Sequence, residues 1–184
     1  MAADVHIRSA EPDDAEAISE IGRAAMPAQY RGLVDPAAVS AAVAQTYSVE
    51  AVVDSINRCR TAELAEFLVA ERDGTVEGYL HFDSFGPEPE LHRLYVSSDA
   101  RGGGIGARLM EELQARLPSD VRYMLLVLEG NDRAVAFYEK HGLYIDGFVD
   151  GLAYYNQRMA VKFPASTQPF RLVLMRQEPV ASQR

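Results

Sequence analysis

The sequence predicts a mixed α/β fold, in which helices flank a central sheet. Apolar residues recur with helical spacing in some segments and alternate like strands in others, in mixed order along the chain. A glycine-rich loop joins a predicted strand at 91–96 to a helix, and a second apolar strand follows at 123–128. With 184 residues, the chain suits one well-buried core, so we expect a single domain spanning residues 1–184.

The first third of the chain is expected to be mainly helical. Residues 5–9 alternate like a short strand, and Pro12-Asp13-Asp14 then begins a helix, because proline and acidic residues suit a first turn. The sequence predicts a loop at 27–36 and two further helices, at 37–47 and 49–60. This helical part precedes the main sheet.

The central part predicts a hairpin followed by a parallel strand pair. Two strand-like segments, 67–71 and 76–85, flank Asp73-Gly74, and Asp-Gly readily adopts the positive φ angles of a tight hairpin turn. The strands at 91–96 and 123–128 are joined through a helix, so we expect them to run parallel.

The last third continues the mixed pattern. A helix is expected at 131–141, closed by Gly142, and strands are expected at 144–148 and 170–176. Residues 151–168 show no pattern that assigns them to a helix or a strand. The apolar strand near the end could pair with a second copy at a sheet edge, which would make a homodimer possible.

Charge and composition limit the partners. The formal charge of −9 argues against a nucleic acid, because phosphates are neutralised by a basic surface, and it favours a cationic substrate such as an amine. No apolar run approaches the roughly 18 residues of a membrane span, and the first residues lack the features of a signal peptide. We therefore expect no membrane partner and a cytoplasmic location.

Cysteine and histidine usage predicts no metal site. Cys59 is the only cysteine, which excludes an internal disulfide and a thiolate metal cluster. The histidines show no spacing typical of metal ligands; they are His6, His81, His92 and His141.

The glycine-rich loop predicts a phosphate site. It lies at the start of a helix whose apolar stripe includes Ile105, Leu109 and Leu113. Without Cβ atoms, such a backbone can aim several amides at one anion, where the helix dipole adds about half a positive charge. A loop that is only flexible is the less favoured interpretation, because strand, loop and helix follow in the required order.

Two known kinds of phosphate-binding loop can be compared with these glycines. No Lys-Ser or Lys-Thr follows the glycines, which excludes a Walker loop. A dinucleotide loop fits better, since Gly102, Gly104 and Ala107 match its pattern and Glu129 ends the next strand. Against it, residues 97–101 separate the strand from the first glycine, and too few alternating strands and helices surround the unit.

The helix at 131–141 carries a second candidate group. Asn131 suits the N-cap, and Ala134, Phe137, Tyr138 and His141 share one helix face. An aromatic pair on a helix face more often belongs to a core, and only its coincidence with the glycine loop favours a functional role.

These two blocks resemble the signatures of the GNAT N-acetyltransferase superfamily. Arg101, Gly104 and Gly106 match the first signature position by position, and residues 131–142 match the second, which contains Tyr138. Leu94-Tyr95-Val96 is similar to the family strand whose main chain binds the pantetheine arm. The resemblance covers residues 91–143.

The resemblance implies the GNAT acyl-CoA N-acyltransferase fold and acetyl-CoA as cofactor. In that fold, two central parallel strands splay apart and admit the acetyl-pantetheine arm; here they would be 91–96 and 123–128. The residues that the resemblance assigns to cofactor binding are Leu94, Tyr95, Val96, Arg101, Gly102, Gly103, Gly104, Ile105, Gly106, Asn131 and Ala134.

The implied activity is transfer of the acetyl group of acetyl-CoA to a primary amine, by direct attack in a ternary complex. Tyr138 matches the family tyrosine that protonates the departing sulfur, and the ordinary pKa of a phenol, near 10, keeps it protonated at neutral pH. Glu90 and His92, on one strand face, are candidates for the general base, as is Glu88 in the preceding loop.

Two positions depart from the family pattern. Leu126 stands where acetyltransferases of ribosomal-protein N-termini often carry a glutamate base, and Leu143 replaces a common phenylalanine. The acceptor therefore stays open between a small-molecule amine and a protein N-terminal amine. An NAD-type dinucleotide-binding module and a non-catalytic acyl-CoA-binding protein of the same fold are the alternatives.

Overall fold

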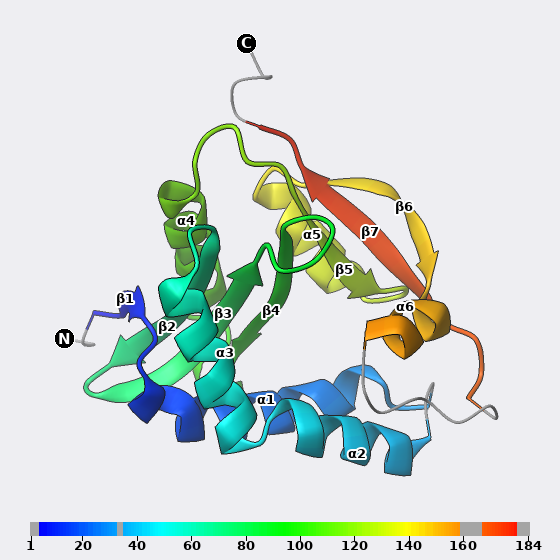
Figure 1. Cartoon of the computed structure of the whole chain (residues 1–184), viewed down its shortest axis with the longest axis horizontal. Helices are drawn as coiled ribbons and strands as arrows, with labels where there is room; N and C mark the ends of the chain where they lie inside the picture. The colour runs from blue at the N-terminus through cyan, green and yellow to red at the C-terminus, as the bar shows by residue number, and fades with distance from the viewer. Residues whose placement is uncertain (1–3, 33–34, 159–166, 180–184) are drawn as a thin grey trace.

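The computed structural model describes residues 4–32, 35–158 and 167–179. Its centre is a seven-stranded sheet in the order β1-β2-β3-β4-β5-β7-β6 (Figure 1). The paired strands run antiparallel, except β4 and β5, which run parallel. The strands are β1 (His6–Ser9), β2 (Ala65–Arg72), β3 (Thr75–Asp83), β4 (Glu90–Val96), β5 (Tyr123–Leu128), β6 (Tyr144–Asp150) and β7 (Arg171–Gln177).

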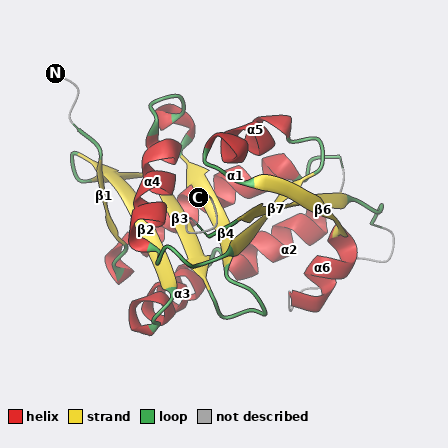
Figure 2. Ribbon diagram, turned by 90° about the horizontal axis from the view of Figure 1, so that it is seen from above, coloured by secondary structure: helices red, strands yellow, loops and turns green. Residues whose placement is uncertain are grey.

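Helices cover both faces of this sheet (Figure 2). On one face, α1, α2 and α3 build a core with one set of strand residues, and α4 and α5 build a second core on the other face. The sheet alternates as expected, because Phe67 and Val69 face the first core while Leu68 and Ala70 face the second. The helices are α1 (Ala15–Gln29), α2 (Pro36–Thr46), α3 (Val49–Thr61), α4 (Ile105–Arg116), α5 (Asp132–Lys140) and α6 (Gly151–Arg158), with short 3₁₀ turns at Pro12–Asp14 and Ser98–Ala100.

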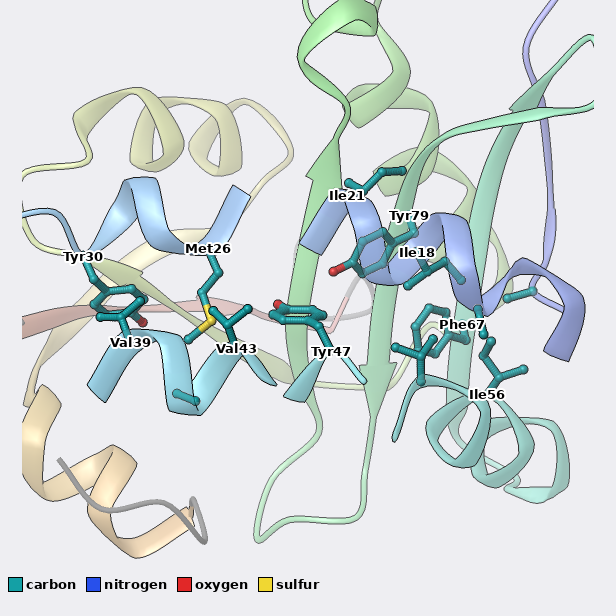
Figure 3. Close-up of a cluster of buried hydrophobic side chains, with 14 of the residues drawn as sticks. Ile18, Ile21, Met26, Tyr30, Val39, Val43, Tyr47, Ile56, Phe67 and Tyr79 are labelled. Carbon is teal, nitrogen blue, oxygen red and sulfur yellow. The ribbon is translucent and has the colours of Figure 1, made fainter. Parts of the chain in front are cut away.

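The first core locks α1 against α2 and the sheet. Met26 of α1 and Tyr30, the C-cap of that helix, lie beside Val39 and Val43 of α2 (Figure 3). Gly22 permits the closest approach, since a Cβ there would lie 2.3 Å from the ring of Tyr47. Tyr47 is therefore fixed by the backbone of α1, with 2% of its surface exposed.

The predicted hairpin is confirmed. β2 and β3 pair in antiparallel register, and the turn residues Asp73 and Gly74 have φ angles of +50° and +76°. These positive angles suit a two-residue turn that follows the twist of the strands.

The predicted parallel pairing of β4 and β5 is also confirmed, and it is short. The two strands share one registered pair, Glu90 with Met124, and the Met124 amide donates to the Pro89 carbonyl at 3.0 Å. Beyond this pair the strands diverge, as the resemblance implied. On its other edge β4 pairs with β3, and a register shift there leaves His92 without a partner residue.

Three segments differ from the sequence predictions. Helix α1 continues through Pro27 into the predicted loop, because Met26 and Tyr30 pack on α2 and hold its last turn. Residues 151–158, unassigned from sequence, form α6. The expectation that the last strand supplies a dimer edge is wrong: β7 lies between β5 and β6, and β6 occupies the edge.

Candidate active site

The divergence of β4 and β5 opens a cleft of about 800 Å³ that passes between the two faces of the sheet. On the α4 and α5 side it is lined by the glycine loop and by Tyr138. On the other side it is lined by Tyr30, Tyr95 and Tyr155, which belong to or pack against the first core. One continuous space therefore joins two chemically different chambers.

The glycine loop presents the start of α4 to the cleft. Gly104 is the N-cap, with φ at +76°, and a Cβ added there would meet no atom within 4 Å. Its carbonyl accepts the first backbone hydrogen bond of the helix, from Arg108, and the amides of residues 104–107 have no backbone acceptor among the described residues, which leaves them for a ligand. This open, positively polarised backbone fits a diphosphate.

The predicted cofactor residues gather at the cleft, with one exception. Those that line it are Leu94, Tyr95, Val96, Arg101, Gly102, Gly104, Ile105, Gly106, Asn131 and Ala134. Gly103 is not among the lining residues; its amide donates to the Ala100 carbonyl at 3.3 Å.

Strand β4 offers a free backbone edge along the cleft. Leu94, Tyr95 and Val96 pair with β3 on one side, and their other side faces the gap, because β5 pairs with β4 only at Glu90. Unpaired strand groups are ready hydrogen-bond partners for an extended ligand. This edge fits an amide-bearing arm such as pantetheine.

Helix α5 brings Tyr138 to the same cleft. Asn131 caps the helix by accepting from the Ala134 amide at 3.2 Å. Tyr138 is half-buried, and its hydroxyl makes no hydrogen bond with any residue that the structure describes. Burial raises the pKa of Tyr138, so the phenol stays protonated at neutral pH.

Phe137 shows that the aromatic pair serves packing as well. A Cβ on Gly106 would lie 3.5 Å from the Phe137 ring, so the two helices approach closely at that glycine. Phe137 and Tyr138 both pack against the second core and both line the cleft. The core interpretation and the functional one are therefore compatible.

His92 lies at the start of β4 between two carboxylates. Its Nε2 is 3.0 Å from Asp83 Oδ1, and its Nδ1 is 3.4 Å from Glu90 Oε1. Burial alone would lower the pKa of His92, but contacts with Asp83 and Glu90 raise it to about 9. His92 is therefore an imidazolium at neutral pH, with both ring nitrogens engaged.

Glu90 is held in place by α6. Its Oε1 accepts from the Tyr154 hydroxyl at 2.7 Å, and its Oε2 pairs with Arg158. Burial alone would raise the pKa of Glu90, but His92, Tyr154 and Arg158 lower it to about 2. Glu90 is 6% exposed and does not line the cleft, whereas His92 does. As predicted, the two side chains share one face of β4.

His81 and Glu88 lie near His92 and Glu90 but differ from them in charge or in partner. His81 Nε2 lies 3.2 Å from Asp83 Oδ2, and burial lowers the pKa of His81 to about 4, so it is neutral. Glu88 pairs instead with Arg176, away from the His92 contacts, and its side chain is 46% exposed.

Sequence reasoning missed the chamber on the α1 side. The Tyr30 hydroxyl donates to the Tyr155 hydroxyl at 2.7 Å, which joins the end of α1 to α6 across 125 positions of sequence. Tyr154 and Arg158 were missed for the same reason, since α6 was not assigned. The cluster of aromatic residues at 154–155 was the available signal.

Two other features concern the described residues as a whole. They contain no group of three or more His, Cys, Asp and Glu side chains placed to hold a metal ion. None of their helices combines the length and apolar character needed to cross a membrane.

Comparison with known proteins identifies the family. Residues 37–143, more than half of the chain, match the acetyltransferase (GNAT) family model. The region includes both sequence blocks described above, together with most of the cleft lining.

Individual relatives agree with that match. Spermidine N(1)-acetyltransferase of Thermoplasma acidophilum is 24% identical over 77% of this chain and 89% of its own length. An IAA acetyltransferase of Azospirillum brasilense is 39% identical over 41% of this chain and 52% of its own length.

A solved structure shows the same fold. PaiA N-acetyltransferase from Thermoplasma acidophilum, in complex with coenzyme A, superposes with a TM-score of 0.72 at 22% identity, covering 95% of this chain and 99% of its own. The family match fits the open glycine loop and the free edge of β4. This chain belongs to the GNAT family and is an acetyltransferase that uses acetyl-CoA.

Proposed function

We propose that this protein transfers the acetyl group of acetyl-CoA to a primary amine in one direct step, with both substrates bound at once. The observation that carries the proposal is the single pair between β4 and β5, which opens one cleft from the glycine loop to Tyr138 and on to the chamber of Tyr30 and Tyr155. Two substrates can meet in such a space from opposite faces of the sheet.

The glycine loop and β4 would hold the cofactor. The free amides at Gly104 and the next residues of α4 would bind its diphosphate, and the free edge of β4 at 94–96 would bind the pantetheine arm. When bound, acetyl-CoA supplies an activated acyl thioester. By holding the arm, the strand edge would orient that thioester towards an amine in the cleft.

Tyr138 is proposed to protonate the departing sulfur. The new N–C bond forms as the C–S bond breaks, so the thiolate needs a proton. Tyr138 lines the cleft on the cofactor side, is protonated at neutral pH because burial raises its pKa, and has a hydroxyl that is not committed to a described partner. After each turnover, the phenol would regain its proton from solvent.

Glu90 and His92 remain the predicted candidates for the general base that takes the proton from the amine. His92 is the better placed, because it lines the cleft while Glu90 lies behind it. To accept a proton from the amine, His92 must first release its own, which its pKa of about 9 favours only in alkaline solution. Glu90 would act by holding His92 through the 3.4 Å contact.

The relatives support an amine as the class of acceptor. One relative is named for spermidine, and this chain is acidic overall, with a formal charge of −9. We favour a small-molecule amine, because Tyr30 at the end of α1 and Tyr155 of α6, joined by a 2.7 Å hydrogen bond, line the α1 side of the cleft. A protein N-terminal amine is the alternative that the test below includes.

The test is an amine library assayed with acetyl-CoA and a thiol-release readout. The library holds polyamines, amino acids, aromatic amines, aminoglycosides and short peptides with free N-termini. Release that requires both protein and amine supports the proposal. If no amine stimulates thiol release, the proposal fails, and the protein is better described as a non-catalytic acyl-CoA-binding protein of the same fold.

Thermal shift separates the remaining alternative. A ligand at 100 times its dissociation constant stabilises the folded state by about 2.7 kcal/mol. We expect acetyl-CoA to raise the melting temperature and NAD to leave it unchanged. The reverse result would identify a dinucleotide-binding module.

A further inference from the structure

Arg93 lies on the chamber side of β4, next to His92. It pairs in register with His81 of β3, and its guanidinium carbon is 5.1 Å from the ring centroid of Tyr47. Arg93 lines the cleft with Tyr30 and Tyr155. The face that holds Tyr47 is the α1 to α3 face, opposite the one that holds Tyr138.

The guanidinium of Arg93 makes no hydrogen bond or ion pair with any described residue, and it lies over the Tyr47 ring. The segments outside the described residues contain no aspartate or glutamate that could pair with it. Arg93 is partly exposed and lines the cleft. An arginine with five donors is therefore open at the cleft.

The surrounding charges leave Arg93 unneutralised. His92 and Arg158 each carry one positive charge. Asp83 and Glu90, the carboxylates that they contact, each carry one negative charge, so these four groups balance one another. Asp83 is near enough to Arg93 for an electrostatic attraction, but this carboxylate already contacts His81 and His92, and it accepts from the Phe85 amide. His81 is neutral because its pKa is lowered to about 4. The positive charge of Arg93 thus remains for a ligand.

Its position is also rigid. The ring of Tyr47 is fixed against Gly22 of α1, and the guanidinium lies over that ring. Stacking on an aromatic ring leaves the edge of an arginine free for a planar anion. Such an edge matches a carboxylate, which accepts two parallel hydrogen bonds.

We propose that Arg93 binds an acid group of the acceptor, so that the preferred substrate is a small primary amine that also carries a carboxylate, as amino acids do. This inference rests on the proposed acetyl transfer. It differs from attraction by net charge, because the charged residues of β4 that line the cleft, His92 and Arg93, are basic while the whole chain is acidic. The acid group would rest on Arg93 while the amine reaches the gap beside Leu94.

The first experiment compares matched amines with the wild-type protein. Leucine is paired with isopentylamine, tyrosine with tyramine and ornithine with putrescine, and spermidine is included as a further acid-free amine. Any amine that the library identifies as an acceptor is also tested, together with the matching compound that carries or lacks the carboxylate. We expect kcat/KM to be at least tenfold higher for the acid-bearing member of the pairs that react.

The possible results are distinct. Equal or faster acetylation of the acid-free members would overturn the role of Arg93 and leave the proposed acetyl transfer intact. Acetylation of no amine at all would overturn the proposed function, and the acceptor assignment with it.

The second experiment changes the arginine. Arg93→Met removes the charge at similar length, and we expect KM for the acid-bearing amine to rise about ten- to a hundredfold, as for the loss of a charge-assisted hydrogen bond. Arg93→Lys keeps the charge without the planar fork and should recover part of this loss. Binding of acetyl-CoA, measured by calorimetry, should change by less than about twofold, which also shows that the variants are folded.

Arg58→Met is the matched control, because Arg58 also lies over an aromatic ring, 4.4 Å from the centroid of Phe85, and is not a lining residue of the cleft. It should leave both substrates unaffected. If Arg93→Met lowers the melting temperature but changes KM equally for acid-bearing and acid-free amines, Arg93 is a structural residue and the proposal fails.

Discussion

Glu90 and Met124 face each other at the one registered pair that joins the parallel strands β4 and β5. This pair lies at the start of β4, where Glu90 is also held by Tyr154 and Arg158 of α6. The strands are thus joined at one end and open at the other. The cleft exists because hydrogen bonding between them stops there.

The positive φ angle of Gly104 predicts a specific loss of cofactor binding. Gly104→Ala places a Cβ in the open cradle and strains the backbone, which costs about 1–3 kcal/mol in a left-handed conformation. Gly74→Ala is the matched control, because Gly74 has the same φ of +76° and equally open surroundings in the β2–β3 turn. Both variants should melt earlier, and calorimetry should show weaker acetyl-CoA binding only for Gly104→Ala. Equal binding by both would remove the loop from the cofactor site.

Removal of the Tyr138 hydroxyl is expected to slow chemistry. Tyr138→Phe should lower kcat by about tenfold or more while acetyl-CoA affinity stays near that of the wild type, because the proton donor is lost and the packing is kept. Tyr123→Phe is the control, since the Tyr123 hydroxyl is buried and the residue does not line the cleft. Steady-state kinetics with saturating acetyl-CoA decide the matter. Unchanged turnover in Tyr138→Phe would exclude this tyrosine as the acid.

The contacts of Glu90 predict a loss of stability. Glu90→Gln removes a buried negative charge from His92, Tyr154 and Arg158, and should cost about 1–3 kcal/mol in the free energy of unfolding. Glu88→Gln breaks only the exposed pair with Arg176 and should cost less than about 1 kcal/mol. Denaturant titration measures both.

Activity tests the role of Glu90 separately. We expect kcat of Glu90→Gln to fall by less than about tenfold, because both oxygens are already engaged and the residue acts by positioning His92. A direct base would be worth about a hundredfold or more. A loss of that size at every pH would therefore identify Glu90 as the group that takes the amine proton.

The raised pKa of His92 predicts a pH dependence of stability. The folded protein holds the His92 proton up to a pKa of about 9, whereas the unfolded chain releases it near 6.5. The stabilisation is therefore complete below about pH 6.5 and is lost as the pH rises towards about 9, by roughly 1–3 kcal/mol. Denaturant titrations across this window should show the decline in the wild type.

Two variants check that the decline belongs to His92. His92→Gln should flatten the profile between about pH 6.5 and 9. His6→Gln, at an exposed position of β1, should keep the slope of the wild type. A slope that survives in His92→Gln would assign it to another group.

The sequence by itself determined the elements that depend on local spacing. The turn at Asp73 and Gly74, the glycine loop before α4 and the helix face that carries Tyr138 each lie within a few residues of chain. Their backbone conformation and periodicity are set by the residue types present, such as a glycine at a positive φ angle or an asparagine at an N-cap. The parallel pairing of β4 and β5 followed from chain order, since a helix joins them.

Only the tertiary structure decided what surrounds those elements. Tyr30 meets Tyr155 across 125 positions, and Glu90 meets Tyr154 across 64, so no local pattern announces either contact. The pKa of His92 and the unpaired charge of Arg93 depend on which carboxylates reach them, and that is set by how α6, β3 and β4 pack. Electrostatic environment is a property of three-dimensional neighbours, which spacing along a chain does not encode.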